Sequence, residues 1–333
     1  MSRPILSVRD LIVRFDLGRG LFGPDRVLTA IDGVSFDLGA GETLGIVGES
    51  GSGKSTLGRA ILRLIPAEAG QIVWLGQDLR RLGEGAMRPL RRDLQIVFQD
   101  PLAALDPRAT VFQSIAEPLA THRPDMTRIQ MREAVSRWLA RVGLDDTALD
   151  RYPHEFSGGQ CQRIGIARAM ILEPRLIVCD EAVSALDVSI QAQIVNLLAA
   201  LQRETGVALL FISHNLAVVR HLSHRILVLY LGRVAEIGPA EALFADPCHP
   251  YTRALLAAVP PPDPVAARGR RRAGLTGEPP SPLNPPSGCA FRTRCPLAIE
   301  ICATTMPTAE AIDDDALHLA ACHRWRDRST QGA

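Results

Sequence analysis

Apolar and polar residues alternate in two stretches near the beginning of the chain. The apolar positions are Leu11, Val13, Phe15 and Leu17 in the first stretch and Val34, Phe36 and Leu38 in the second. A period of two is typical of half-buried strands, because successive side chains of a strand point to opposite faces. The first part of the chain is therefore predicted to be rich in sheet.

Uninterrupted apolar runs follow, and helical patterns separate them. Residues 43–47 are predicted to form a buried strand, and apolar residues keep helical spacing from Leu57 to Ile65, where Pro66 should end the helix. Between about 101 and 153 the strand signals fade, which indicates a helical insert. Strands are predicted again at 176–179, 208–212 and 226–230, with a helix over about 190–203. Such alternation predicts a mostly parallel, covered sheet.

The composition and charge of the chain exclude several classes of protein. The chain has 333 residues, 47% of them hydrophobic, which is enough for a full core and excludes a disordered or fibrous protein. Lysine plus arginine number 37 and aspartate plus glutamate 36, so no strong field is available to hold nucleic acid. We find neither a signal peptide nor an apolar run near the roughly 20 residues of a membrane span. We therefore expect a cytoplasmic chain that reaches a membrane only through partners.

A glycine-rich segment between a predicted strand and a predicted helix fits the phosphate-loop pattern. Its residues are Gly48, Glu49, Ser50, Gly51, Ser52, Gly53, Lys54 and Ser55, followed by Thr56. Glycines let successive backbone N–H groups and the positive end of the helix dipole face a polyphosphate. Lys54 is expected to reach the β- and γ-phosphates, and the Ser55 hydroxyl to bind Mg²⁺. The alternative is a glycine-rich turn that binds nothing.

Two carboxylates end the predicted strand at 176–179. Asp180 is expected to help hold Mg²⁺, and Glu181 to polarise a water for in-line attack on the γ-phosphorus. A solvated strand end is the alternative.

Earlier in the chain, Ser157 is placed as a helix cap before Gly158, Gly159 and Gln160. This makes a second helix start that is suited to anions, and an ordinary helix cap is the alternative.

Taken in order, these motifs resemble the nucleotide-binding domains of ABC transporters. Gln99 in VFQD, residues 184–187 (SALD) and His214 in FISHN complete the set, and the resemblance covers about residues 5–238. It implies an α/β P-loop NTPase fold, with a RecA-like core, an antiparallel β subdomain and a helical subdomain. Alanine stands at 182, where the family usually has proline after the catalytic glutamate. Proline there would preset the backbone angle, and we expect activity to survive its absence.

The same resemblance implies roles for single residues. Phe15 would stack on adenine, unless it is a core aromatic, and Gln99 would touch Mg²⁺ or the attacking water and sense the membrane subunit. His214 would contact the γ-phosphate, and Asp187 would cross to a second protomer. Two chains head to tail would sandwich two ATP molecules, each held by the phosphate loop of one chain and residues 157–160 of the other.

Within the family, four segments resemble the ATPase subunits of oligopeptide, dipeptide and nickel importers. They are residues 152–163, the stretch EAVSALDVSIQAQI, the stretch HPYTRALLAAVP from His249, and GCAFRTRCP in the tail. Residues 20–23 (GLFG) favour the second of the two ATPase types of such importers. The resemblance implies ATP and Mg²⁺ as cofactors, a second ATPase subunit, two membrane-spanning permease subunits, an extracytoplasmic substrate-binding protein, and a place at the cytoplasmic face of the cell inner membrane.

Peptide is the expected cargo, with nickel, glutathione or opines as alternatives. The competing classes of function are a soluble ABC ATPase of DNA repair or translation, an exporter, and a catalytically silent partner. The sequence shows no coiled-coil arms or second cassette, which argues against the first class, and no fused membrane helices, which argues against an exporter. Lys54, Asp180, Glu181 and His214 are all present, which argues against a silent partner.

The tail differs in composition from the rest. From Pro260 onward a proline-rich, basic linker leads to four cysteines, Cys289, Cys295, Cys302 and Cys322. In a reducing compartment such a cluster indicates metal before disulfide, and four thiolates suit zinc or iron–sulfur. The family resemblance favours a [4Fe–4S] cluster with a structural role. The expected domains are 1–100 with 155–240 (ATP-binding core), 101–154 (helical subdomain) and 241–333 (extension).

Overall fold

The computed structural model describes residues 3–19, 25–258, 277–313 and 315–326. Of the predicted linker that begins at Pro260, residues 260–276 lie outside these ranges, and so do residues 20–23 (GLFG). The chain divides into two compact units. One comprises Met1–Leu6, Asp37–Thr43 and Val73–Ser213, and the other Ser7–Phe36, Leu44–Ile72 and His214–Ala333. Of the described helices, none is both long and apolar enough to cross a membrane.

The first unit contains a parallel sheet and a group of helices. Its strands are β6 (Leu94–Val97), β7 (Leu176–Asp180) and β8 (Ala208–Ile212), with β7 in the middle. Every residue of β7 and β8 is buried, which explains why these strands read as continuous apolar runs. The register pairs Val97 with Cys179 and Asp180 with Ile212.

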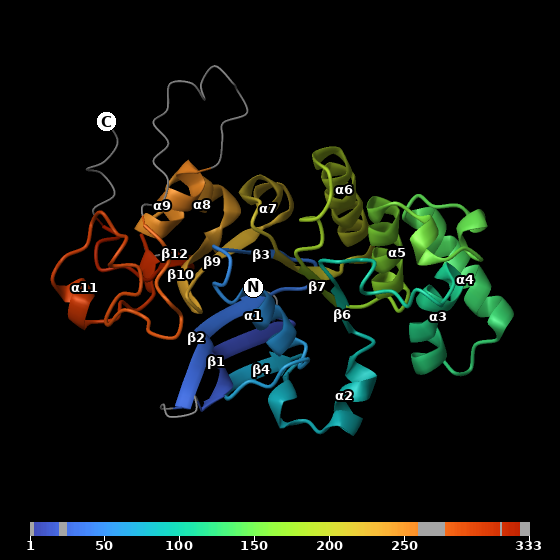
Figure 1. Ribbon diagram of the computed structural model, residues 1–333, viewed down its shortest axis with the longest axis horizontal. Coiled ribbons are helices and arrows are strands. Elements are labelled where there is room, and N and C mark those ends of the chain that lie inside the picture. Colours follow the sequence, from blue (N-terminus) through green and yellow to red (C-terminus); the bar gives the residue numbers. More distant parts are fainter. Residues whose placement is uncertain (1–2, 20–24, 259–276, 314, 327–333) are drawn as a thin grey trace, which may run out of the picture. The chain divides into compact units, whose positions relative to one another are not determined.

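The helices of this unit include those expected of the insert and of the sheet connections, and also a short helix at Glu84–Leu90 that was not predicted. They are α2 (Glu84–Leu90), α3 (Val111–His122), α4 (Arg128–Arg141), α5 (Gly158–Met170) and α6 (Val188–Thr205), with short 3₁₀ turns at Leu79–Arg81, Asp146–Ala148 and Pro153–Glu155. Helices α3, α4 and α5 pack on one another (Figure 1). Thr110 and Thr127 open α3 and α4 with reciprocal capping boxes, which fixes both starts.

The second unit contains the amino-terminal strands and the phosphate loop. Strands β1 (Leu6–Arg19), β2 (Asp25–Leu38) and β4 (Ala69–Trp74) are neighbours in the order β2-β1-β4. The last residues of β4 pair with β5 (Gln77–Asp78). Strand β3 (Thr43–Val47) is wholly buried and leads into α1 (Lys54–Ile61). The prediction that α1 extends to Pro66 was wrong, because Arg63 adopts a left-handed backbone (φ 52°) that no α-helix can continue through.

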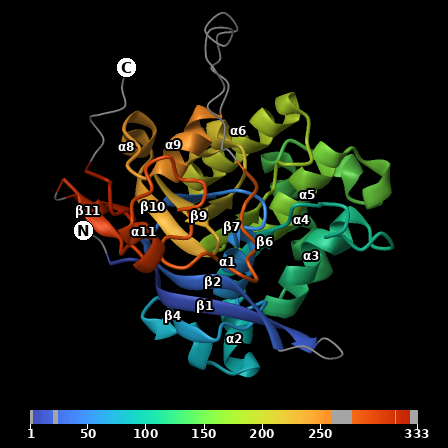
Figure 2. The same cartoon turned by 60° about the vertical axis from the view of Figure 1, so that its left-hand side comes forward.

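The tail adds antiparallel strands that the sequence did not indicate. Strand β3 pairs in parallel with β9 (Arg225–Tyr230), β9 pairs with β10 (Arg233–Pro239), and β10 pairs with β12 (Asp315–Ala320), which also pairs with β11 (Glu310–Ile312). Helices α7 (Leu216–Leu222), α8 (Ala240–Ala245), α9 (Pro250–Ala257) and α11 (Ile301–Thr304) complete the unit. Figure 1 shows β12 beside β10, and Figure 2 shows β11 at the same end of the sheet, so the segment at 310–320 extends this sheet.

Candidate nucleotide site and cysteine tail

The backbone of the phosphate loop depends on its glycines. Gly48, Gly51 and Gly53 have φ values of 155°, 77° and 101°. A Cβ on Gly48 would lie 2.2 Å from the Leu229 carbonyl oxygen, and one on Gly53 would lie 2.4 Å from that of Ala30. Because both contacts are with backbone, no side chain can be accommodated at either position.

The loop offers the groups that a polyphosphate needs. Helix α1 begins directly at Lys54, so its first N–H groups and its dipole point to the loop. The Lys54 ammonium donates to the carbonyl oxygens of Gly48 (2.9 Å) and Glu49 (2.8 Å). The Ser52 hydroxyl is buried and has no hydrogen-bond partner among the described residues. An orphaned donor of this kind suits a phosphate oxygen.

Two residues of the extension at 241–333, which the sequence did not single out, hydrogen-bond to the same loop. The Glu49 N–H donates to the Tyr251 hydroxyl (2.8 Å), and the Arg294 guanidinium donates to both Glu49 carboxylate oxygens (2.6 and 2.9 Å). Both residues lie in segments quoted for their resemblance to peptide importers, but neither spacing nor hydropathy indicated contacts across 202 and 245 positions.

Asp180 and Glu181 lie at the carboxyl end of β7. Asp180 is 2% exposed, and Glu181 is half-buried with a left-handed backbone (φ 50°). The Glu181 N–H donates to the Ile212 carbonyl (3.1 Å), and its own carbonyl accepts from the Ser184 hydroxyl (2.9 Å). The main chain therefore fixes the direction in which this carboxylate leaves the strand end.

Ser157 caps α5 as predicted. Its hydroxyl accepts from the Gln160 N–H (3.3 Å), and the Gln160 side chain accepts from the Ser157 N–H (3.0 Å). A Cβ on Gly159 would meet Ile190 at 2.5 Å, so this glycine is needed for packing. Ser157, Gly158 and Gln160 are exposed, which leaves this helix start open to another molecule.

The remaining predicted residues are distributed over the two units. Gln99 follows β6 and Asp187 is the residue before α6, and both are exposed in the first unit with residues 157–160, Asp180 and Glu181. Phe15 is half-buried on β1, and His214 is exposed before α7, both in the second unit with the phosphate loop. Each unit is described by itself, so the structure brings together only those predicted residues that share a unit.

The four tail cysteines lie near one another and form no disulfide. The Cys289 N–H donates to the Cys302 carbonyl (2.8 Å). Burial, and then the charges of Cys295, Cys289 and Cys302, raise the pKa of Cys322 to about 11. Burial likewise raises the pKa values of Cys289 and Cys295. Burial and neighbouring cysteines thus oppose ionisation of these thiols, and a bound cation would favour their deprotonated, ligating form.

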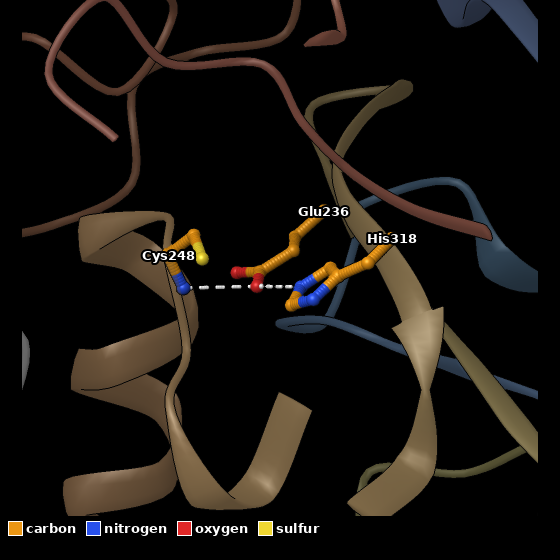
Figure 3. A group of neighbouring side chains, drawn as sticks. All are labelled: Glu236, Cys248 and His318. Atoms are coloured by element: carbon orange, nitrogen blue, oxygen red, sulfur yellow. Dashed lines mark hydrogen bonds and ion pairs between the residues drawn. The ribbon is translucent and has the colours of Figure 1, made fainter. Parts of the chain in front are cut away.

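A different group has the tightest spacing of candidate ligands in the described ranges. Ligand atoms of Glu236, Cys248 and His318 lie within 4.8 Å of one another (Figure 3). The buried Glu236 carboxylate accepts from the N–H groups of Cys248 and His249 (both 2.9 Å) and lies 2.8 Å from His318 Nε2. Burial alone would raise the pKa of Glu236, but these hydrogen bonds hold it below its ordinary value. The group therefore ties β10 to β12 and to the start of α9, and sequence spacing gave no sign of it.

Two family models match different segments of the chain. The family model "ABC transporter" matches residues 31–184, and "Oligopeptide/dipeptide transporter, C-terminal region" matches residues 235–302. The chain is 55% identical over 309 residues to the oligopeptide transport ATP-binding protein OppF of Salmonella typhimurium, covering 92% of each chain. It is 51% identical over 321 residues to the Haemophilus influenzae protein of the same name, covering 96% of each.

Solved structures agree with the fold. The dimeric post-hydrolysis structure of an ATP-binding cassette with ADP and Pi has a TM-score of 0.64 and 27% identity, and covers 71% of this chain and 98% of that one. A cassette of a Clostridium perfringens ABC transporter complex has a TM-score of 0.64 and 26% identity, and covers 74% and 92%. The predicted α/β ABC cassette fold is confirmed.

Proposed function

The chain belongs to the ATP-hydrolysing family of ABC transporter ATP-binding proteins, and we propose that it energises the import of oligopeptides or dipeptides. Peptide is proposed as the cargo because the chain matches both a cassette and the oligopeptide-type C-terminal region. It is also 55% identical to an oligopeptide transport protein along 92% of the chain.

Each residue of the proposed site has a defined task. The phosphate loop would bind the ATP phosphates through its N–H groups, Lys54 and the Ser52 hydroxyl. Ser55, Gln99 and Asp180 would hold Mg²⁺, which neutralises charge on the β- and γ-phosphates. Glu181 would orient the attacking water, with His214 steadying the γ-phosphate, and Phe15 would stack on adenine.

A second cassette is proposed to complete the site. Residues 157–160 are open to another molecule, and a similar cassette has been solved as a dimer. In a head-to-tail pair, Ser157, Gly158, Gly159 and Gln160 would meet the ATP of the partner, and Asp187 would cross the interface. ATP would then close the dimer and hydrolysis would release it, which is how nucleotide energy could drive permease subunits between two states.

The permease contact is proposed beside Gln99. A cleft there is lined by Phe98, Pro101, Leu105, Pro118 and Arg168 among others, and Phe98 and Leu102 are 38% and 48% exposed. Exposed apolar groups around a cleft suit an inserted protein segment. Such a contact would place the chain at the cytoplasmic face of the inner membrane, with a substrate-binding protein on the other side. The proposed domains are the ATP-binding core (1–100 with 155–240), the helical subdomain (101–154) and the C-terminal extension (241–333).

The proposed chemistry is tested by Glu181→Gln. The change keeps the side-chain shape but removes the charge that orients the water, so ATP hydrolysis should fall at least about 100-fold while ATP binding persists. Steady-state turnover and equilibrium ATP binding measure the two effects. Glu173→Gln is the matched control, since Glu173 is an exposed glutamate of the same unit with a left-handed backbone (φ 52°). Near-normal turnover of Glu181→Gln would refute the role of Glu181.

The four tail cysteines, Cys289, Cys295, Cys302 and Cys322, are proposed to bind a [4Fe–4S] cluster with a structural role. The gaps between these cysteines are five, six and nineteen residues, with none of the two-to-four-residue spacings typical of structural zinc sites. The family resemblance adds support for the iron–sulfur centre. Anaerobically purified protein should be brown and absorb near roughly 400 nm. Colourless protein with stoichiometric zinc would refute the cluster, and protein without metal would refute any metal site.

A further inference from the structure

The carboxylate of Glu49 projects from a loop that has to receive a polyanion. Glu49 is the second residue of the phosphate loop, and its side chain is 25% exposed. An unpaired carboxylate there would repel the phosphates of ATP across a short distance and in a medium less polar than bulk water. A glutamate at this position therefore needs a neutralising partner if ATP is to bind tightly.

Arg294 is that partner. Its side chain is 4% exposed, and its two terminal nitrogens each donate to one oxygen of Glu49, at 2.6 and 2.9 Å. The hydrogen bond to Glu49 is the main reason that the pKa of Arg294 lies above its ordinary value. Paired parallel hydrogen bonds fix direction as well as charge, so the contact also restrains the loop.

The cysteine segment holds the guanidinium in place. The Arg294 N–H donates to the Phe291 carbonyl (3.0 Å), and the Arg292 N–H donates to that of Cys289 (3.1 Å), so Arg294 lies on a turn between Cys289 and Cys295. The Phe291 ring packs against Tyr230 (5.3 Å between centroids) and Tyr251 (5.4 Å). Tyr251 in turn accepts the Glu49 N–H, so α9 and the cysteine segment together contact the backbone and the side chain of one loop residue.

We propose that Arg294 is a positioning residue for ATP binding, which neutralises and orients Glu49 and thereby makes nucleotide affinity depend on the cysteine segment. The inference rests on the proposed function of the phosphate loop. Because Arg294 lies between two of the tail cysteines, a change that loosens this segment also withdraws the guanidinium from Glu49.

The test compares Arg294→Met, Glu49→Gln and the double variant in the full-length chain. Arg294→Met keeps much of the side-chain volume but leaves Glu49 charged and unpaired, so the Kd for Mg-ATP should rise about tenfold. Glu49→Gln removes the charge that requires neutralising, so the double variant should return to within about threefold of wild type. A role in packing alone would not produce this rescue.

Arg292→Met is the matched control, since Arg292 belongs to the same turn but hydrogen-bonds to Ser287. It should leave the Kd unchanged. Hydrogen exchange of the amides at 48–55 gives a readout independent of activity and should speed up in Arg294→Met but not in Arg292→Met. If Arg294→Met does not fold, Arg294→Gln takes its place in the same comparisons.

Wild-type affinity in Arg294→Met, or a double variant as weak as Arg294→Met, would overturn the inference. A wild-type chain that binds no ATP would instead overturn the proposed function, so the two failures are distinguishable.

Discussion

Glu181 combines the proposed catalytic charge with a backbone that glutamate rarely adopts. A left-handed residue other than glycine costs on the order of 1 kcal/mol, and such costs are concentrated at functional sites. Here the conformation is held by the hydrogen bonds of Glu181 to Ile212 and to Ser184. The alanine that follows it is buried. These contacts, and not a proline ring, define the local geometry, which is a physical reason to expect activity despite Ala182.

His249 predicts a specific dependence of stability on pH. The side chain is buried, caps α9 by accepting the Tyr251 N–H (3.0 Å), and has a pKa lowered by burial to about 4. Between pH about 6.5 and 4 the unfolded chain binds a proton that the folded chain refuses. The free energy of unfolding should therefore fall over this window as pH decreases, by on the order of 3 kcal/mol from His249 alone.

The matched variant for this prediction is His249→Asn, because asparagine caps helices well but does not titrate. Urea unfolding at several pH values should show a shallower loss of stability for the variant between pH 6.5 and 4. Glu236 and Arg253 also act on His249, and Glu236 titrates in both proteins, so the difference between the two curves isolates the histidine. Parallel curves would contradict the assignment.

At the scale of elements, the start of α5 is the best test of dimer geometry. Ser157→Arg places a long charged side chain on an exposed helix start that is proposed to meet the ATP of a partner. It should abolish turnover and ATP-dependent dimerisation while leaving ATP bound to the monomer through the phosphate loop. Sedimentation and nucleotide binding of the purified variant measure these effects. Losing the cap costs about 1 kcal/mol, which the chain should tolerate.

Ser157→Thr is the control for that change, since threonine keeps a capping hydroxyl. It should dimerise and turn over close to the wild-type rate. Equal loss of ATP binding by the isolated Ser157→Arg monomer would mean that this motif acts within one chain and not across an interface.

At the scale of the whole molecule, the tail is part of the second unit and not an appendage. Strand β12 extends the sheet through β10, and Trp325 and Ala320 pack on Cys248 in a small buried cluster. The Glu236 group ties the same strands to the start of α9 (Figure 3). The strands of this tail are thus stabilised by hydrogen bonds and packing that do not involve the proposed cluster at Cys289, Cys295, Cys302 and Cys322.

The sequence alone determined the elements whose signals are local. Wholly buried strands such as β7 and β8 appear as apolar runs, Ser157 and Gln160 form a cap within four residues, and the phosphate loop matches a contiguous pattern at residues 48–55. Motif order was sufficient for the family. The end of α1 was misplaced because apolar spacing continued past Arg63, whose left-handed backbone the spacing does not reveal.

Only the tertiary structure decided the contacts between distant segments. Arg294 and Glu49 are 245 positions apart, and Glu236 and His318 are 82 apart, so no periodicity or motif relates them. A charged residue in a linear sequence is by default a solvated one, and its burial and partner depend on which strands become neighbours. The phosphate loop could therefore be recognised from its own residues, whereas its contact with the cysteine tail could be found only in the folded chain.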